Sequence, residues 1–308
     1  MPIHKITDDF FFIQRGYLNG NHLVYKGQQV ALFDTAYTSG IEDTIKILQE
    51  LAIDIQKISL IINTHSHSDH VGANHYIQSQ AQCEIALHKI GQYFINRKEI
   101  FFLGWKFDRP QTEFFQVTRG LEDGEIIPTG PYRWRVIHTP GHAFDGIVLY
   151  EPFQKWLISG DALWEADVAS LNLYKQGGSA LFQMYDSIER LASLEVKVVF
   201  PGHGKMFSNY DEAIAKSRQK IQAYFDNPSQ IGHDFIKKVM IFSLMMLDGV
   251  EEKEFYPMLL KREWFKHTVD LYFNGEYETQ YQTIVNKFIQ RGLVIRKDGK
   301  LMTIINKG

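Results

Sequence analysis

The chain has 308 residues, of which 44% are hydrophobic and 22% charged, and a formal net charge of -3 at pH 7. These values are typical of a folded globular protein with one large domain and an appended region, and they exclude a general attraction to nucleic acid or anionic membranes. The only cysteine, Cys83, excludes an internal disulfide framework. Because residues 1–9 lack a signal-peptide core and no apolar run approaches the about 20 residues of a membrane span, we expect a cytoplasmic protein.

The first informative element is an apolar run over residues 58–63, which predicts a buried strand that ends in a polar loop. Residues 64–70 then read Thr-His-Ser-His-Ser-Asp-His, and residues 71–77 are expected to continue as a helix. Imidazole and carboxylate groups are ligands that divalent metals prefer. The loop therefore predicts a metal site, and adjacent ligands that diverge favour two ions. The candidate ligands are His65, His67, Asp69 and His70.

Three later strand-like runs each end in a glycine turn that presents one more ligand. Residues 135–142 end in Thr-Pro-Gly-His, residues 156–161 in Ser-Gly-Asp, and residues 196–204 in Pro-Gly-His-Gly. Glycine permits a backbone turn that a residue with a Cβ resists, so each ligand can be aimed inward. These ligands are His142, Asp161 and His203.

In this order and at these intervals, the motifs closely resemble those of the metallo-β-lactamase superfamily over residues 1 to about 208. The resemblance implies an α/β fold, a four-layer αββα sandwich with the site at one edge between the sheets. It implies one metal held by His65, His67 and His142, and a second held by Asp69, His70 and His203. Asp161 would bridge both ions together with a hydroxide. Residues 30–35 resemble an early family strand, whose aspartate, here Asp34, lies behind the ligands.

The ligand set and the resemblance predict a dinuclear metal-dependent hydrolase whose bridging hydroxide attacks an ester, thioester or lactone carbonyl. Asp69 is also the predicted catalytic residue, because it can pass a proton from the hydroxide to the leaving group. The cofactors are two divalent metal ions; zinc suits these ligands, and iron and manganese fit the same set. Two alternatives stay open. One is a phosphodiesterase or ribonuclease of the same superfamily, and the other is a non-catalytic regulator that binds a ligand.

An aromatic segment lies between the first motif and His142. Within it, Phe101 and Phe102 are predicted to form an apolar lid or pocket wall, which favours a small-molecule substrate with an apolar or acyl part. The alternative is that the rings pack against the body of the protein or a second subunit. Trp164 stands where some family members, such as acyl-homoserine-lactone lactonases, carry a tyrosine, and its indole is expected to donate a hydrogen bond or line the pocket. The aromatic residues are Tyr93, Phe94, Phe101, Phe102, Trp105, Phe107, Phe114 and Phe115.

The C-terminal region changes to helical spacing over residues 211–225, 231–247 and 277–290. An Asp-Gly pair between two strand-like runs then predicts a hairpin, and a helix followed by a hairpin resembles a winged helix. We therefore predict a catalytic domain over residues 1–208 and a helical, winged-helix-like domain over 209–308. Residues 211–308 hold 15 Lys or Arg and 13 Asp or Glu, a difference of +2, so nucleic acid is not expected. Cleft shaping or homo-oligomer contact is the expected role.

Overall fold

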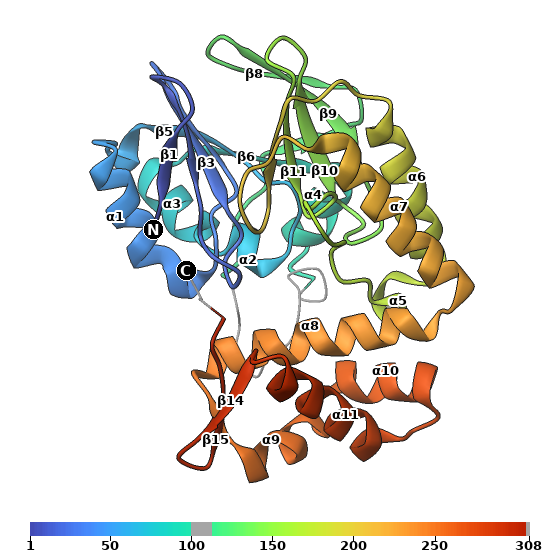
Figure 1. The fold of residues 1–308 in the computed structure, drawn as a ribbon. Coiled ribbons are helices and arrows are strands. Elements are labelled where there is room, and N and C mark those ends of the chain that lie inside the picture. Colours follow the sequence, from blue (N-terminus) through green and yellow to red (C-terminus); the bar gives the residue numbers. More distant parts are fainter. Residues whose placement is uncertain (100–112, 306–308) are drawn as a thin grey trace. The chain divides into compact units, whose positions relative to one another are not determined.

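The computed structural model describes residues 1–99 and 113–305, which divide into two compact units (Figure 1). The first unit comprises Met1–Ala169 and Phe182–Arg218, and the second comprises Ser170–Leu181 and the described residues from Gln219 onward. Helix α7 (Tyr210–Asp226) runs from the first unit into the second. The domain boundary at residue 208 stays a prediction.

One sheet of the first unit has seven strands in the order β1 to β7. Strands β1 to β4 pair antiparallel, and β4 to β7 pair parallel. Apolar side chains of this sheet pack against α1 (Ile41–Glu50), α3 (Asn74–Ala81) and α4 (Lys89–Asn96). The strands are β1 (Ile3–Lys5), β2 (Phe10–Ile13), β3 (His22–Lys26), β4 (Val30–Phe33), β5 (Ile58–Ile62), β6 (Glu84–His88) and β7 (Arg119–Leu121).

The other sheet of the first unit has the strand order β12-β11-β10-β9-β8. Only the β11–β12 pair is parallel. Helix α6 (Ala180–Ala192) lies along this sheet (Figure 1) and is joined to the end of β9 by Arg190, which donates a hydrogen bond to the carbonyl of His138 at 2.8 Å. The strands are β8 (Ile126–Thr129), β9 (Tyr132–His138), β10 (Ile147–Glu151), β11 (Trp156–Gly160) and β12 (Val198–Pro201).

A second apolar core fills the space between the two sheets. Phe10 of the first sheet stacks on Trp134 and Trp156 of the second, with ring centres 5.6 Å and 5.5 Å apart, and all three rings are buried. Aromatic pairs of this kind add about 0.5–1.5 kcal/mol each beyond the area they bury. Helices therefore cover the outer faces of two facing sheets, and the predicted four-layer αββα sandwich is confirmed.

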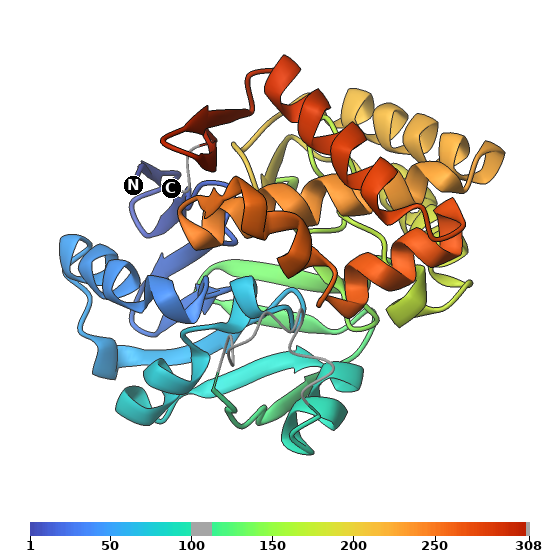
Figure 2. The ribbon, with the colours of Figure 1, turned by 90° about the horizontal axis from the view of Figure 1, so that it is seen from below.

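The second unit is mainly helical and ends in a small sheet of order β13-β15-β14 (Figures 1 and 2). The predicted hairpin is confirmed: its turn residues Asp298 and Gly299 have φ values of 50° and 76°, the left-handed conformation that a two-residue hairpin turn favours. The elements are α5 (Leu173–Gln176), α8 (Ser229–Leu247), β13 (Val250–Glu251), α9 (Glu252–Leu259), α10 (Glu263–Phe273), α11 (Tyr277–Gln290), β14 (Val294–Lys297) and β15 (Lys300–Thr303).

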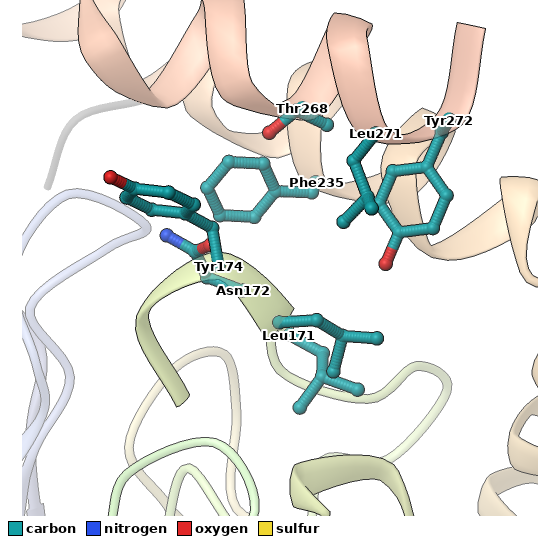
Figure 3. A pocket seen from close by; sticks show the side chains of 8 residues that line it. Leu171, Asn172, Tyr174, Phe235, Thr268, Leu271 and Tyr272 are labelled. Atoms are coloured by element: carbon teal, nitrogen blue, oxygen red, sulfur yellow. The ribbon is translucent and has the colours of Figure 1, made fainter. Parts of the chain in front are cut away.

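A shallow hollow lies in the second unit, where α5 meets α8 and α10 (Figure 3). Its lining is mainly apolar and includes Leu171, Phe235, Leu271 and Tyr272. None of the seven predicted metal ligands lines it. Among residues 1–99 and 113–305, the structure has no helix with both the length and the apolar character needed to cross a bilayer.

A buried carboxylate stabilises the second unit. Asp234 on α8 accepts a hydrogen bond from the Tyr224 hydroxyl at 2.8 Å and forms ion pairs with Lys220 and Lys237. Burial alone would raise the pKa of Asp234, but the two lysines lower it from 3.8 to about 2. We expect Asp234→Asn to lower the free energy of unfolding at pH 7 by about 1–3 kcal/mol, because the variant weakens hydrogen bonds to a charged group.

The same residue predicts a pH dependence of stability. Because the pKa of Asp234 is lower in the folded state, its stabilisation is complete above about pH 4 and is lost as the pH falls toward 2. Urea unfolding of the wild type and Asp234→Asn should therefore show a smaller difference at pH 3 than at pH 7. An equal difference at pH 3 and pH 7 would contradict the stabilising role of the Asp234 carboxylate. The control is Glu212→Gln, which removes an exposed ion pair with Lys216.

Candidate metal centre

All seven predicted ligands lie at or just beyond the carboxyl ends of strands, in the first unit. The first sheet contributes the loop after β5 and the short helix α2 (Ser68–Val71) that follows it, and the second sheet contributes the turns after β9, β11 and β12. Loops at strand ends are common positions for functional side chains, because the sheet holds them rigidly. The ligands are His65, His67, Asp69, His70, His142, Asp161 and His203.

The structure brings these seven side chains together. Their nitrogen and oxygen atoms form three overlapping groups, and within each group all the atoms lie within 4.8 Å of one another. Donor atoms that share a tetrahedral zinc, with bonds of about 2.0–2.2 Å, lie roughly 3.3–3.6 Å apart. The groups therefore have the donor chemistry of metal sites, and their atoms lie close enough together to surround an ion. They are His65, His67 and His142; His65, His70 and Asp161; and Asp69, His70 and His203.

Asp161 lies between the two outer groups. Its Oδ2 is 3.3 Å from Nε2 of His142 and 3.7 Å from Nε2 of His70, and its Oδ1 is 3.7 Å from Nε2 of His203. Nε2 of His203 is in turn 3.2 Å from Oδ2 of Asp69. A carboxylate that faces histidines of both groups is in the right place to contact two ions at once.

The electrostatics of the cluster suit cations. Burial, with help from His70, lowers the pKa of His65 well below its ordinary value, and burial and His142 lower that of His67 to about 3. Both imidazoles are therefore neutral near pH 7, the form that binds metals. Burial would raise the pKa of Asp161, but the surrounding histidines, His203 first, hold it well below its ordinary range. The buried cluster thus contains the ionised carboxylate of Asp161 and the neutral imidazoles of His65 and His67.

Asp34 lies directly behind the ligands. Its carboxylate accepts hydrogen bonds from the backbone N–H and the hydroxyl of Thr64, both at 2.8 Å, and is 2.8 Å from Nδ1 of His70. Burial would lower the pKa of His70, but the nearby carboxylates, led by Asp34, raise it well above its ordinary value. Nε2 of His70 is buried and makes no hydrogen bond among the described residues. A histidine with Nδ1 on a carboxylate and Nε2 turned into the cluster has the orientation of a metal ligand.

Sequence reasoning missed a buried polar network under the loop. The carbonyl of His70 accepts hydrogen bonds from the Asn63 side chain at 3.1 Å and from the backbone of Thr35 at 2.7 Å. Asn74 joins the two, because it donates to Asn63 and accepts from the Thr35 hydroxyl, each at 2.7 Å. A polar residue that ends an apolar run was the only signal for Asn63, and nothing in the sequence identified its partners.

Two glycines allow close approach around Asp161. Gly160 has φ +49°, and a Cβ there would lie 2.7 Å from the Thr64 side chain. A Cβ on Gly202 would lie 2.3 Å from Oδ1 of Asp161 and 2.9 Å from the ring of His70. The glycine of the Pro-Gly-His motif is therefore required by the space that two ligands occupy, and that of the Ser-Gly-Asp motif by the close approach of Thr64.

Of the residues predicted to contact substrate, the structure describes Trp164 but not Phe101 and Phe102. Trp164 donates a hydrogen bond from its indole nitrogen to Oδ1 of Asp161 at 3.2 Å, and its ring centre lies 5.5 Å from that of His203. Phe101 and Phe102 lie outside the described residues. Of the other aromatic residues, Phe115 is buried in the core between the first sheet and its helices, and Phe114 packs against that core. For these two rings, the packing alternative is correct.

Two facing sheets with a histidine and aspartate cluster at their strand ends define a metal-binding αββα protein, and comparison with known proteins identifies the family. Residues 19–203 match the model of the metallo-beta-lactamase superfamily, and the chain belongs to this superfamily. A relative in Homo sapiens, the acyl-coenzyme A thioesterase MBLAC2, is 26% identical over 239 residues, which are 66% of this chain and 81% of the relative.

Two further comparisons extend this picture. The hydroxyacylglutathione hydrolase of Rhodospirillum rubrum is 31% identical over 147 residues, which are 47% of this chain and 48% of that enzyme. The crystal structure of a metallo-beta-lactamase family protein from Thermus thermophilus aligns with a TM-score of 0.62 and 20% identity. That alignment covers 97% of this chain and 100% of the other, and it supports the fold.

Proposed function

We propose that the chain is a dinuclear metal-dependent hydrolase that cleaves an ester, thioester or lactone carbonyl in a small molecule with an acyl part. The observation that carries the proposal is the convergence of seven donor side chains from both sheets into overlapping groups. Thioesters are the first candidates, because the human relative is named an acyl-coenzyme A thioesterase and the Rhodospirillum rubrum relative a hydroxyacylglutathione hydrolase.

Each ligand has a place in the proposed site. One ion would be held by His65, His67 and His142, the second by Asp69, His70 and His203, with Asp161 between them. Zinc is the expected metal, and iron and manganese suit the same nitrogen and oxygen donors.

Bound divalent ions would lower the pKa of a water molecule and polarise the scissile carbonyl. Burial raises the pKa of Asp69, but His70 and His203 outweigh that effect and lower it, so the carboxylate is ionised near pH 7. Its Oδ2 can then accept a proton and return it to the leaving group. Trp164 holds Asp161 in place through its indole N–H. The side chains of His142, His203 and Asp69 are 10%, 10% and 13% exposed, so the cluster is largely enclosed by the protein.

A substrate panel tests the proposal. Zinc-loaded protein would be assayed with p-nitrophenyl acetate, an acyl-coenzyme A thioester, an acyl-homoserine lactone and bis(p-nitrophenyl) phosphate. We expect kcat/KM for at least one carbonyl substrate to exceed that for the phosphodiester by tenfold or more. The reverse order would support the phosphodiesterase or ribonuclease alternative, and protein with two bound metals that cleaves none of the four would support the non-catalytic regulator.

Metal removal should lower thermal stability. Because the ligands come from both sheets, bound ions cross-link them, and a ligand at about 1,000 times its Kd stabilises a protein by about 4 kcal/mol. For a unit of this size, each kcal/mol shifts Tm by roughly 2–4 °C. We therefore expect calorimetry to show a Tm roughly 8–16 °C lower after chelation, with recovery when zinc is restored. Equal Tm values, together with failure to take up any metal, would rule the site out.

A further inference from the structure

The loop that carries the first ligands alternates two kinds of side chain. Each of His65, His67 and Asp69 follows a hydroxyl residue. His67 has an extended backbone, with φ -65° and ψ 146°, and Ser68 begins helix α2. None of the three hydroxyl residues belongs to a ligand group, and each is only 1% exposed. They are Thr64, Ser66 and Ser68.

Two of these buried hydroxyls meet a buried carboxylate. The carboxylate of Asp34, which follows β4 of the first sheet, accepts both the backbone N–H and the hydroxyl of Thr64. Asp145, in the turn before β10 of the second sheet, accepts the same two donors from Ser66. Two carboxylates from opposite sheets, Asp34 and Asp145, therefore accept hydrogen bonds from alternate residues of one loop.

The burial of the Asp145 carboxylate is unfavourable for folding. It is 1% exposed, and its Oδ2 has no hydrogen-bond partner among the described residues. That oxygen lies against α4, where a Cβ on Gly91 would be 2.4 Å away. Burial raises the pKa of this carboxyl to about 6. A buried carboxylate with one unbonded oxygen lowers the free energy of unfolding of the chain that carries it.

We propose that Asp145 is a positioning residue of the metal centre, which acts through Ser66 to fix the backbone between His65 and His67 so that both imidazoles meet one ion. An ionised acceptor is required, because hydrogen bonds to a charged group are roughly twice as strong as those between neutral groups. Asp145 belongs to none of the ligand groups, so its influence on the ion passes through the loop. This inference rests on the proposed function, because it presumes that the cluster binds metal.

The test is the zinc affinity of Asp145→Asn, measured on metal-stripped protein by titration against a chromophoric chelator. The amide keeps the shape of the side chain and removes its charge. We expect zinc affinity to fall about tenfold, in the range found when residues behind metal ligands are replaced. The Tm of the metal-free variant should be equal to or above that of the wild type, because a buried charge has been removed. A residue with a purely structural role would lower this Tm.

Ser66→Ala supplies an independent second variant. Ser66→Ala removes the hydroxyl donor but keeps the backbone N–H that Asp145 also accepts. If Asp145 acts through Ser66, the alanine variant therefore loses part of the zinc affinity that Asp145→Asn loses, and the losses in the double variant are less than additive. The control is Asp123→Asn, which removes an exposed carboxylate bound by Arg190 and should leave zinc affinity unchanged.

The outcomes separate this inference from the proposed function. A wild type that takes up no zinc overturns both. A wild type that binds two zinc ions, with equal affinity in Asp145→Asn, overturns the positioning role alone. A metal-free Asp145→Asn protein whose Tm falls together with its zinc affinity assigns Asp145 to folding and also overturns the inference.

Discussion

Asp69→Asn should reduce the turnover of the preferred carbonyl substrate by about 10²–10⁴-fold while the fold is retained. The variant keeps the size of the side chain but removes the carboxylate that can accept a proton, and general acid-base groups contribute rate factors of this size. In the wild type, Oδ2 of Asp69 also lies 3.2 Å from Nε2 of His203, so the variant should hold one ion more weakly. Steady-state kinetics with the panel substrate of highest kcat/KM, at saturating zinc, measure the loss.

Elemental analysis of the same sample completes the experiment. Asp69→Asn protein that carries two metals and keeps wild-type kcat would remove Asp69 from the proposed chemistry. A low kcat at full metal content would assign the loss to proton transfer, and a loss restored by excess zinc would assign it to metal binding. Circular dichroism should match that of the wild type in either case.

Gly202→Ala should weaken metal binding by roughly 100-fold or more, although the substitution adds a single methyl group. The new Cβ would lie 2.3 Å from Oδ1 of Asp161, 2.9 Å from the carbonyl carbon of Gly160 and 2.9 Å from the ring of His70. No arrangement of these groups accommodates it without displacing two proposed ligands, and displaced ligands cost more than the 10–100-fold known for supporting residues. Zinc titration of stripped protein measures the effect.

A neighbouring glycine provides the matched control. Gly204 has φ +89°, and a Cβ there would meet nothing within 4 Å. Gly204→Ala should therefore cost some stability through backbone strain, seen as a lower Tm, but leave zinc affinity near that of the wild type. Equal zinc affinities in Gly202→Ala and the wild type would show that Asp161 does not need its present position.

The parts of this protein that local patterns encode could be predicted from its sequence. Apolar runs over residues 58–63 and 156–161 became β5 and β11, and the polar residues that ended them came together because strand ends share an edge. The Asp-Gly pair predicted the final hairpin, because φ is positive at both turn positions. The helix over Tyr277–Gln290 followed from its spacing.

Features that depend on tertiary contacts could not be predicted. Strand β13 has two residues and exists only because β15 pairs with it, so no local signal marks it. Asn63 and Asn74 look like ordinary polar residues until the fold places them under the carbonyl of His70. No sequence pattern identifies Asp145 either, because its partner Ser66 lies far away along the chain.

The position of β12 determines when the proposed centre can become competent during synthesis. This strand lies at the margin of its sheet and is followed directly by the turn that carries His203. Among the described residues of the first unit, it is the last strand to leave the ribosome. A nascent chain could assemble the other six donors, yet the second ion would lack a ligand until β12 docked beside β11. Metal capture in the newborn protein would thus report that synthesis had passed His203.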